Sequence, residues 1–237
     1  MARANEFGEP VEFEVDTPDG PRTIAITSPG KVMFPKVGVT KLDLAHYYVA
    51  VGEPLLRWIH DRPVLLERYP DGVGGNSFFQ KRIPDSTPEW LATTRVHTVN
   101  GTPSRALVIA SLGEVLWAVN MGVLGLHVWP YRVADAAPRA DTPAATQADW
   151  LGAGSLISHA SDELRIDLDP SPGQTFEHIR EAAMLTRLYF ADQGITSYVK
   201  TSGSKGLHIY VRVQPGWDAF QVRGASITVA RDLAIDL

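Results

Sequence analysis

Two aspartates spaced two residues apart are the clearest candidates for chemistry in this sequence. Asp167 and Asp169 lie in "DELRIDLDP", just before a Pro-Ser-Pro-Gly segment. On one face of a strand, such carboxylates lie close enough to share a divalent cation. Two-metal phosphoryl-transfer sites hold their ions about 3.5–4 Å apart, and without a cation the two like charges would repel. Aspartate is also common where a strand meets a turn. The pair alone therefore leaves a metal site and an ordinary turn both open.

The segment "KTSGSKGLHIYV" (200–211) is a second candidate, because a small Gly-rich turn separates two apolar stretches. Backbone N–H groups and the hydroxyls of Ser202 and Ser204 in such a turn can form a nest for phosphate oxygens. Lys205 adds a positive charge. Strand alternation would place His208 on the polar face of the second stretch, together with Tyr210 and Arg212. A plain hairpin turn with an incidental lysine is the alternative.

Two further stretches combine aromatic or imidazole rings with apolar surroundings. His127 lies in the otherwise apolar run "LGLHVWPYR", where a histidine is often a hydrogen-bonded core residue. Phe78 and Phe79 precede Gln80, Lys81 and Arg82 in "NSFFQKR". Alternation would bury one ring and expose the other, and an exposed ring beside cations suits stacking on a nucleic-acid base. Core packing of both rings is the alternative.

In the last third of the chain, the sequence pattern predicts the strands and helices that position the aspartates. Apolar and polar residues alternate over 164–169, which predicts a half-buried strand with both aspartates on its open face. A helix capped by Thr175 and ending at Gly194 follows. Two strands, 196–201 and 207–213, come next, and a final amphipathic helix begins near Asp218. The order strand, helix, strand, strand is half of a ferredoxin-like or RRM-like sheet.

The first two thirds predict a mixture of strands and capped helices. Residues 1–20 form a polar leader that can add an edge strand. Thr40 with Asp43, and Ser111 with Glu114, have the spacing of helix-capping boxes, the second starting a helix that runs to about Gly122. Strands are expected at 22–27, 63–70, 76–82 and 106–111. The Ala-, Pro- and Thr-rich residues 132–158 lack periodicity and predict a long loop.

Composition narrows the class of protein. The 237 residues include no cysteine, so disulfides and thiolate chemistry are excluded and any metal must be held by Asp, Glu or His. No apolar run reaches membrane-spanning length, and the acidic N-terminus is not a secretion signal, so a cytoplasmic location is expected. No P-loop, dinucleotide fingerprint, nucleophile elbow or HExxH helix is present, which removes the commonest nucleotide-hydrolase and protease classes.

Charge is unevenly distributed. The net charge of −5 argues against indiscriminate binding of nucleic acid, which needs many Lys and Arg contacts to phosphates. Between residues 22 and 82, however, basic side chains outnumber acidic ones, and Lys31, Lys36, Lys41, Arg62 and Arg68 are among them. Either an anion-facing lobe or an ordinary solvated surface would explain that excess.

Taken in series, five segments resemble the polymerase domain of bacterial DNA ligase D and its stand-alone relatives, members of the archaeo-eukaryotic primase superfamily, with the stand-alone proteins closest. They are "SPGKVMFPKVGVTKLDLAHYY", "RPVLLERYPDGVGGNSFFQKR", "GLHVWPYR", "DELRIDLDP" and "VKTSGSKGLHIYV". The resemblance implies a mixed α/β, two-lobed primase-polymerase core with the RRM-like half in its C-terminal third. After a leader (1–21), the catalytic domain (22–237) would comprise a lobe for DNA and 5′-phosphate (22–133), an inserted loop (134–158) and a lobe for metal and nucleotide (159–237).

The resemblance also implies a function and a set of residues. The function is a DNA-repair nucleotidyltransferase of non-homologous end joining. It would extend primers across short gaps or at broken ends, prefer ribonucleotides, and use Mn²⁺ or Mg²⁺ with NTP or dNTP substrates. The implied roles are metal binding by Asp167 and Asp169; catalysis by these and His127; nucleotide binding by Ser202, Ser204, Lys205, His208, Arg68, Gln80 and Lys81; 5′-phosphate binding by Lys31 and Lys41; and template stacking by Phe78 and Phe79. For Lys41, the first turn of the helix capped by Thr40 adds N–H groups that favour an anion.

Two departures keep other functions open. The family carries a third metal-binding aspartate on a strand beyond the last helix, and Asp236, on that helix, does not match it. We therefore expect either a C-terminally incomplete domain or an impaired catalyst. The long 134–158 loop is either a gate or a harmless insertion. A non-catalytic module that binds DNA ends or gaps, and a metal-dependent phosphoesterase, are the rival functions. Expected partners are gapped or broken-end DNA, nucleoside triphosphates, a ligase and end-binding repair proteins, and no membrane.

Overall fold

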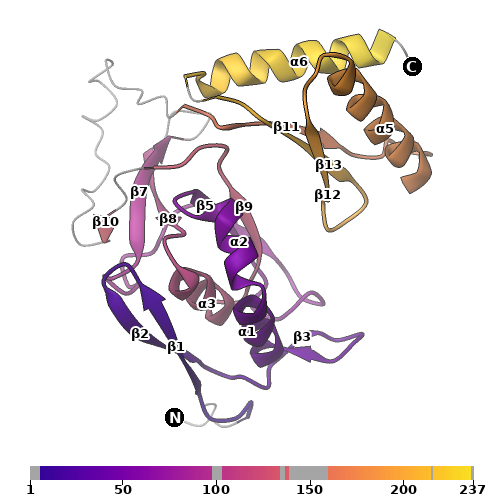
Figure 1. Ribbon diagram of the computed structural model, residues 1–237. Coiled ribbons are helices and arrows are strands. Elements are labelled where there is room, and N and C mark those ends of the chain that lie inside the picture. The colour runs from indigo at the N-terminus through magenta and orange to yellow at the C-terminus, as the bar shows by residue number, and fades with distance from the viewer. Residues whose placement is uncertain (1–5, 98–102, 134–136, 139–159, 215, 236–237) are drawn as a thin grey trace. The chain divides into compact units, whose positions relative to one another are not determined.

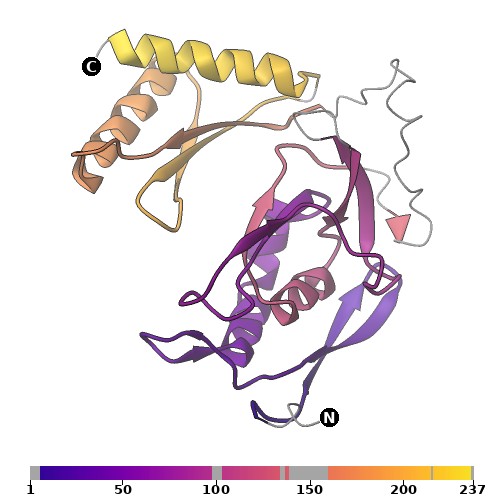
Figure 2. The same ribbon diagram turned by 180° about the vertical axis from the view of Figure 1, so that it is seen from behind.

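The computed structural model describes residues 6–97, 103–133, 137–138, 160–214 and 216–235. The chain folds as two compact units, Met1–Gly154 and Ser155–Leu237, which are shown in Figures 1 and 2 and described separately below. Strands and helices occur in both, so the mixed α/β class is confirmed. Among the described residues no helix is both long enough and apolar enough to span a membrane.

Helix α3 (Leu112–Asn120) is the centre of the first unit. All seven residues from Gly113 to Val119 are buried, as expected of a helix that is apolar all round. Ser111 and Glu114 form the predicted capping box: the Glu114 carboxylate accepts from the Ser111 N–H at 2.8 Å and from its hydroxyl at 2.7 Å. One side of α3 packs in a cluster with β-strand residues such as Leu66 and Leu107, and the other packs with Val15 and Ile26. The capped helix therefore joins a sheet to a hairpin.

The sheet beside α3 is organised by β5 (Pro63–Arg68), which is hydrogen-bonded along both edges. One edge pairs with β8 (Pro103–Val108) and β6 (Phe78–Gln80), and the other pairs with β9 (Val123–Val128), all antiparallel. Beyond β8 lie β7 (Ala92–His97) and the short β10 (Ala137–Pro138). β5 and β6 are confirmed and β8 is shifted from its expected span. Neither β9, which includes most of the apolar run before "WPYR", nor β7 was predicted as a strand.

The hairpin beside α3 contains the N-terminal leader. β1 (Val11–Thr17) pairs antiparallel with β2 (Gly20–Ile26), so the expected edge strand forms. A second, smaller ladder joins β3 (Val32–Phe34) to β4 (Val39–Thr40) and leads into α1 (Lys41–Ala50), which carries the predicted Thr40–Asp43 capping box. Helix α2 (Gly52–Ile59) follows after a single intervening residue.

Buried cations account for part of the basic excess between residues 22 and 82. Arg62 is 1% exposed, and its guanidinium donates to the carbonyls of Trp58 (2.9 Å) and Trp129 (3.0 Å). Lys41 is 7% exposed. Because these two cations bond carbonyls inside the unit, counting basic residues overstated the charge available to an external anion.

The second unit is a three-stranded antiparallel sheet covered on one face by two helices. Its strands are β11 (Glu163–Leu168), β12 (Ser197–Thr201) and β13 (Leu207–Arg212), in the order β11-β13-β12. Helices α5 (Phe176–Asp192) and α6 (Ala219–Ile235) complete the unit (Figure 1). They share one apolar cluster with Leu164, Ile209 and Val211. This arrangement matches the predicted half of a ferredoxin-like sheet. The predicted 134–158 loop lies outside the described residues, apart from the two residues of β10, and Asp236 lies outside them as well.

The buried capping box gives a stability prediction. We expect Ser111→Ala to lower the free energy of unfolding by about 1 kcal/mol, the usual loss for an N-cap. Burial raises the pKa of Glu114 and the Ser111 hydrogen bonds oppose that rise. Losing the hydroxyl therefore raises the folded-state pKa further, so the loss should be larger at pH 7 than at pH 4. Urea titrations at both pH values measure it. An equal loss at the two pH values would show that Glu114 does not depend on Ser111.

Candidate functional site

The two aspartates lie on the open face of the second unit's sheet, as the alternation predicted. Asp167 is exposed on β11 and Asp169 just beyond it, while Leu164 and Leu168 face the helices. Asp167 pairs across the sheet with His208, whose Nε2 lies 3.3 Å from Asp167 Oδ1. Burial lowers the pKa of His208, and the nearby Asp167 carboxylate partly opposes that shift. The two carboxylates are thus accompanied by an imidazole on the neighbouring strand.

Gly206 allows the turn between β12 and β13 to approach Asp169 closely. A Cβ at this position would lie 2.5 Å from Asp169 Oδ1 and 2.5 Å from the Leu168 carbonyl, so no side chain fits. The Asp169 carboxylate therefore lies against the turn that carries Ser204 and Lys205. This contact is the feature that most clearly joins the two predicted parts of the site, the carboxylates and the phosphate turn.

The carboxylates fit a divalent cation that is completed by other ligands. Among the described residues, no group of three or more His, Cys, Asp or Glu side chains is arranged to hold a metal ion. Mg²⁺ usually keeps several waters and is bound by one or two carboxylates together with substrate phosphates. Asp167 and Asp169 are oxygen donors, and both are exposed. They can therefore supply the protein's share of such a site.

The turn itself differs from the predicted phosphate nest. The Ser202 hydroxyl accepts from the N–H groups of Gly206 (3.1 Å) and Ser204 (3.3 Å), and the Ser202 N–H donates to the Gly206 carbonyl. The expectation that these N–H groups point outward is therefore wrong for two of them. Ser202 shapes the turn, whereas Ser204 and Lys205 are the exposed polar groups.

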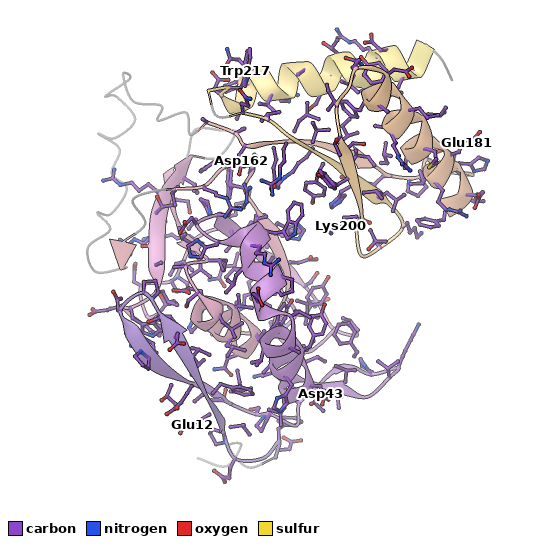
Figure 3. The ribbon with its side chains drawn as sticks, viewed as in Figure 1. Glu12, Asp43, Asp162, Glu181, Lys200 and Trp217 are labelled. Carbon is purple, nitrogen blue, oxygen red and sulfur yellow. The ribbon has the colours of Figure 1, made fainter. Side chains whose placement is uncertain are left out.

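Sequence reasoning placed Tyr210 on the polar face with His208 but missed Lys200 on the neighbouring strand. The cross-strand register places Lys200 opposite His208, which is opposite Asp167, and places Tyr210 opposite Arg165. The Arg165 guanidinium lies 5.5 Å from the Tyr210 ring centre. Burial and the Arg165 charge lower the pKa of Lys200, labelled in Figure 3. Alternation along β12 places Lys200 on one face of the strand, but only the register with β13 shows that it lies beside His208.

In the first unit, His127 lies on β9 and is held by a carboxylate. Its side chain is 51% exposed, so the interpretation as a core histidine is wrong. His127 Nε2 lies 3.1 Å from Glu67 Oε2, and the Tyr69 hydroxyl donates to Glu67 Oε1 at 2.7 Å. The edge of the imidazole meets the Phe79 ring, with 5.3 Å between the ring centres. Neither Glu67 nor Tyr69 was identified from the sequence.

Phe78 and Phe79 are both exposed, at 46% and 55%. Burial of one ring, expected from alternation, is therefore wrong. The Arg68 guanidinium lies 5.3 Å from the Phe78 ring centre and donates to Gln80 Oε1 at 2.8 Å. The structure thus brings Arg68, Gln80 and Phe78 together. Lys81, also predicted, is exposed beside them.

The two predicted phosphate-binding lysines are joined through the backbone but differ in environment. The Lys41 N–H donates to the Lys31 carbonyl at 2.9 Å. The Lys41 ammonium donates to the carbonyls of Thr27 (2.8 Å) and Asn120 (3.2 Å), and burial together with the Lys31 charge lowers its pKa. The Lys31 ammonium is more accessible and pairs with Asp71 at 3.2 Å. The first helical N–H groups are already bonded within the unit, so the expected free anion site at this helix start is wrong.

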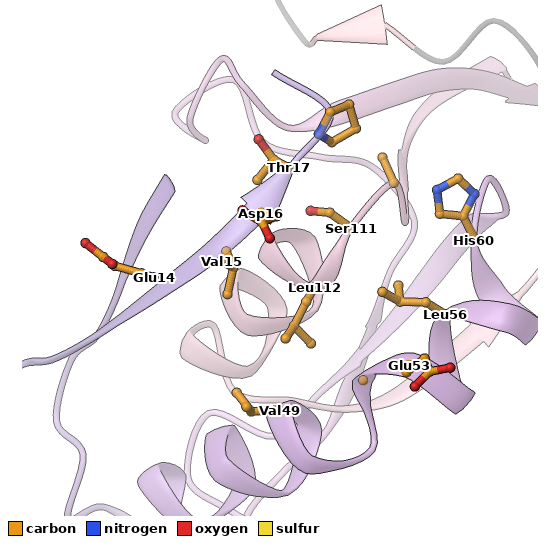
Figure 4. A pocket seen from close by; sticks show the side chains of 13 residues that line it. Glu14, Val15, Asp16, Thr17, Val49, Glu53, Leu56, His60, Ser111 and Leu112 are labelled. Carbon is orange, nitrogen blue, oxygen red and sulfur yellow. The ribbon is translucent and has the colours of Figure 1, made fainter. Parts of the chain in front are cut away.

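A hollow elsewhere in the first unit does not contain the predicted residues. Figure 4 shows it between β1, α2 and the start of α3, with Leu56, Leu112 and Ser111 among its lining residues. Its charged lining includes the carboxylates of Asp16 and Glu53, which would disfavour an anionic ligand. It is not a candidate for the nucleotide.

Comparisons with known proteins identify the family of this chain. The family model described as "LigD, primase-polymerase domain" matches residues 40–237. The chain belongs to this family. The polymerase domain of Mycobacterium tuberculosis ligase D, solved in complex with DNA, matches with a TM-score of 0.72 and 30% identity, covering 89% of this chain and 68% of that one.

Curated relatives are also named LigD, and they are longer than this chain. A multifunctional non-homologous end joining protein LigD from Mycobacterium bovis is 32% identical over 208 residues, which cover 88% of this chain. The bifunctional LigD of Bacillus subtilis is 30% identical over 192 residues. This chain spans 25% of the first relative and 27% of the second. The primase-polymerase family is therefore established for this chain, and the similarity covers only a part of each relative.

The Gly206 contact gives a prediction that involves cation binding alone. We expect Gly206→Ala to displace the Asp169 carboxylate and weaken Mn²⁺ binding several-fold, because the new methyl group would overlap Asp169 Oδ1. Gly224→Ala is the matched control, since a Cβ there meets no atom within 4 Å. Electron paramagnetic resonance titration of Mn²⁺ measures both. Equal Mn²⁺ affinities in the two variants would contradict this account of the turn.

Proposed function

We propose that this chain is a template-directed polymerase that extends a primer across short gaps or at double-strand-break ends in DNA repair, with a preference for ribonucleotides. The observation that carries the proposal is the approach of the Gly206 turn to Asp169, on the sheet face that also bears Asp167 and His208. Paired carboxylates beside a turn with a lysine suit the transfer of a nucleotide from a triphosphate. Membership of the LigD primase-polymerase family supports the same function.

The nucleotide would be held by residues of the second unit. Asp167 and Asp169 would hold Mn²⁺ or Mg²⁺. When bound, such ions neutralise charge at the α-phosphate and lower the pKa of the primer 3′-hydroxyl. Lys205 and Ser204, both exposed, would contact the triphosphate, and His208 would donate from the adjoining strand. The β11–β13 ladder positions Asp167, and Asp169 follows directly after its last pair.

The first unit would bind the DNA. Phe79 and Phe78 offer exposed rings on which template bases can stack, a contact worth about 1–3 kcal/mol per base. Within this unit, Arg68, Gln80 and Lys81 are the proposed nucleotide-binding residues, and His127 is the proposed catalytic residue. Lys31 would bind the 5′-phosphate on the far side of a gap, with Lys41 behind it as a buried cation. Phosphate contacts of this kind set register, while base pairing selects the nucleotide.

A non-catalytic module that binds DNA ends or gaps is the second candidate. One observation favours it: among the described residues, no three His, Cys, Asp or Glu side chains are grouped so that they could hold a metal ion. Under this alternative the Lys31 region would carry the function, and the aspartates would have no catalytic role. The two candidates differ in whether the chain forms a phosphodiester bond.

Primer extension separates these candidates. Wild-type protein with Mn²⁺ and labelled NTP on a gapped duplex carrying a 5′-phosphate should add nucleotides, and ribonucleotides faster than deoxyribonucleotides. Asp167→Ala should reduce incorporation at least about 100-fold, because the cation loses a ligand, while binding to the gapped DNA stays within about twofold. Asp192→Ala, which removes an exposed carboxylate from α5 of the same unit, is the control. Absence of incorporation by the wild-type protein, with binding intact, would favour the non-catalytic module.

The 5′-phosphate contact can be tested by binding alone. Lys31→Ala should reduce the preference for a 5′-phosphorylated gap over an unphosphorylated one and lower the salt slope of binding by about 1. Lys36→Ala is the matched control, because Lys36 is an exposed lysine five residues away. Fluorescence anisotropy at several salt concentrations measures both effects. If the two variants lose the preference equally, Lys31 has no specific phosphate contact.

A further inference from the structure

The pairing of β5 with β9 creates a diagonal contact between Glu67 and His127. In this ladder Glu67 is opposite Gly125 and Leu65 is opposite His127, so all four residues face the same side of the sheet. Gly125 has no side chain, and a Cβ there would lie 2.6 Å from Glu67 Oε2 and 3.1 Å from His127 Nε2. The glycine therefore provides the space in which the carboxylate reaches the imidazole.

Both carboxylate oxygens of Glu67 have a defined partner. Oε1 accepts from the Tyr69 hydroxyl at 2.7 Å, and Oε2 lies 3.1 Å from His127 Nε2. The Tyr69 hydrogen bond, more than His127, lowers the pKa of Glu67, so the carboxylate is ionised at neutral pH. An ionised carboxylate only accepts hydrogen bonds. His127 must therefore donate from Nε2, which fixes the orientation of the ring and presents its Nδ1 edge away from Glu67.

The Glu67–His127 contact is expected to add little to the stability of the fold. The His127 side chain is 51% exposed and that of Glu67 is 22% exposed, and ion pairs at such positions contribute about 0–1 kcal/mol. The ring also meets Phe79 edge to face, so two neighbours restrict its rotation. An exposed imidazole held from two sides is better suited to meeting a ligand in one orientation, as the carboxylate-oriented histidine of a catalytic triad does.

We propose that Glu67 is a positioning residue, which acts through His127 to orient the imidazole toward the incoming nucleoside triphosphate, with Tyr69 holding the carboxylate and Gly125 leaving room for it. This inference rests on the proposed nucleotide site at His127. It adds Glu67, Tyr69 and Gly125 to the residues on which nucleotide affinity depends, although none of the three needs to touch the nucleotide. Orientation of a binding group can change rates or affinities up to about 100-fold when it is lost.

The ring orientation can be measured without any activity. Protein with ¹⁵N-labelled histidine should give a His127 signal with a slowly exchanging Nε2–H, assigned by its absence in His127→Ala. Glu67→Ala and Gly125→Ala should both lose that protection, the second because the methyl group displaces the carboxylate. Glu67→Gln should retain it, since the amide oxygen accepts in the same place. Protection that survives in Glu67→Ala would overturn the proposed contact.

Nucleotide affinity tests the consequence. With ATP and Mn²⁺ as the probe, Glu67→Ala and Gly125→Ala should each weaken ATP binding roughly 10-fold or more. Glu67→Gln should bind ATP within about threefold of the wild-type affinity. The control Gly224→Ala should leave the affinity unchanged. In a His127→Ala background, Glu67→Ala should have no further effect, because the two residues act as one unit. An equal loss in the presence and absence of His127 would overturn the positioning role.

The two proposals fail differently. If the wild-type protein binds ATP with Mn²⁺ but adds no nucleotide to a primer, the polymerase function fails while the Glu67 series still reports on His127. If ring protection is lost in Glu67→Ala but ATP affinity is unchanged, the contact exists and its role in nucleotide binding is wrong.

Discussion

The pairing of β5 along both of its edges is the constraint on which the first unit depends. Its alternation sends Val64 and Leu66 into the core beside α3, whereas Glu67 faces the other side. Because β6 and β9 both pair with the C-terminal half of β5, Phe79 and His127 are brought to Glu67 from segments far apart in the chain. The same backbone ladder thus assembles the core on one face and a cluster of functional side chains on the other.

The second unit holds two carboxylates close together, one on a short strand and one just after its end. Their repulsion is tolerated because both are exposed to water and because His208, Lys200 and Arg165 occupy neighbouring places on the same face. The close approach of Gly206 to Asp169 then limits where that carboxylate can move. A face that carries both signs of charge at fixed spacing suits a ligand that combines a cation with phosphates, since each part finds an opposite charge.

Local patterns predicted local structure well. The capping boxes at Ser111 and Thr40 and the alternation on β11 depend on residues two or three positions apart, and the structure confirms them. Contacts between distant segments could not be predicted in this way. Glu67 and His127 are 60 residues apart, and the burial of Lys41 depends on the carbonyl of Asn120, 79 residues away. The Phe78–Phe79 prediction failed because alternation buries a side chain only where another layer covers that face, and no layer covers either ring fully.

Two arginine side chains link the core to the site. Arg62 and Arg132 both donate to carbonyls at the end of α2, where the helix dipole favours positive charge. Arg62 also donates to the Trp129 carbonyl, and the Trp129 N–H donates to Pro63. These bonds hold the segment that follows β9 against the start of β5, so they fix the β5–β9 register. A one-residue slip in that register would turn His127 to the opposite face. Arg62 and Arg132 therefore support the imidazole from a distance, through the backbone of the segment that follows β9.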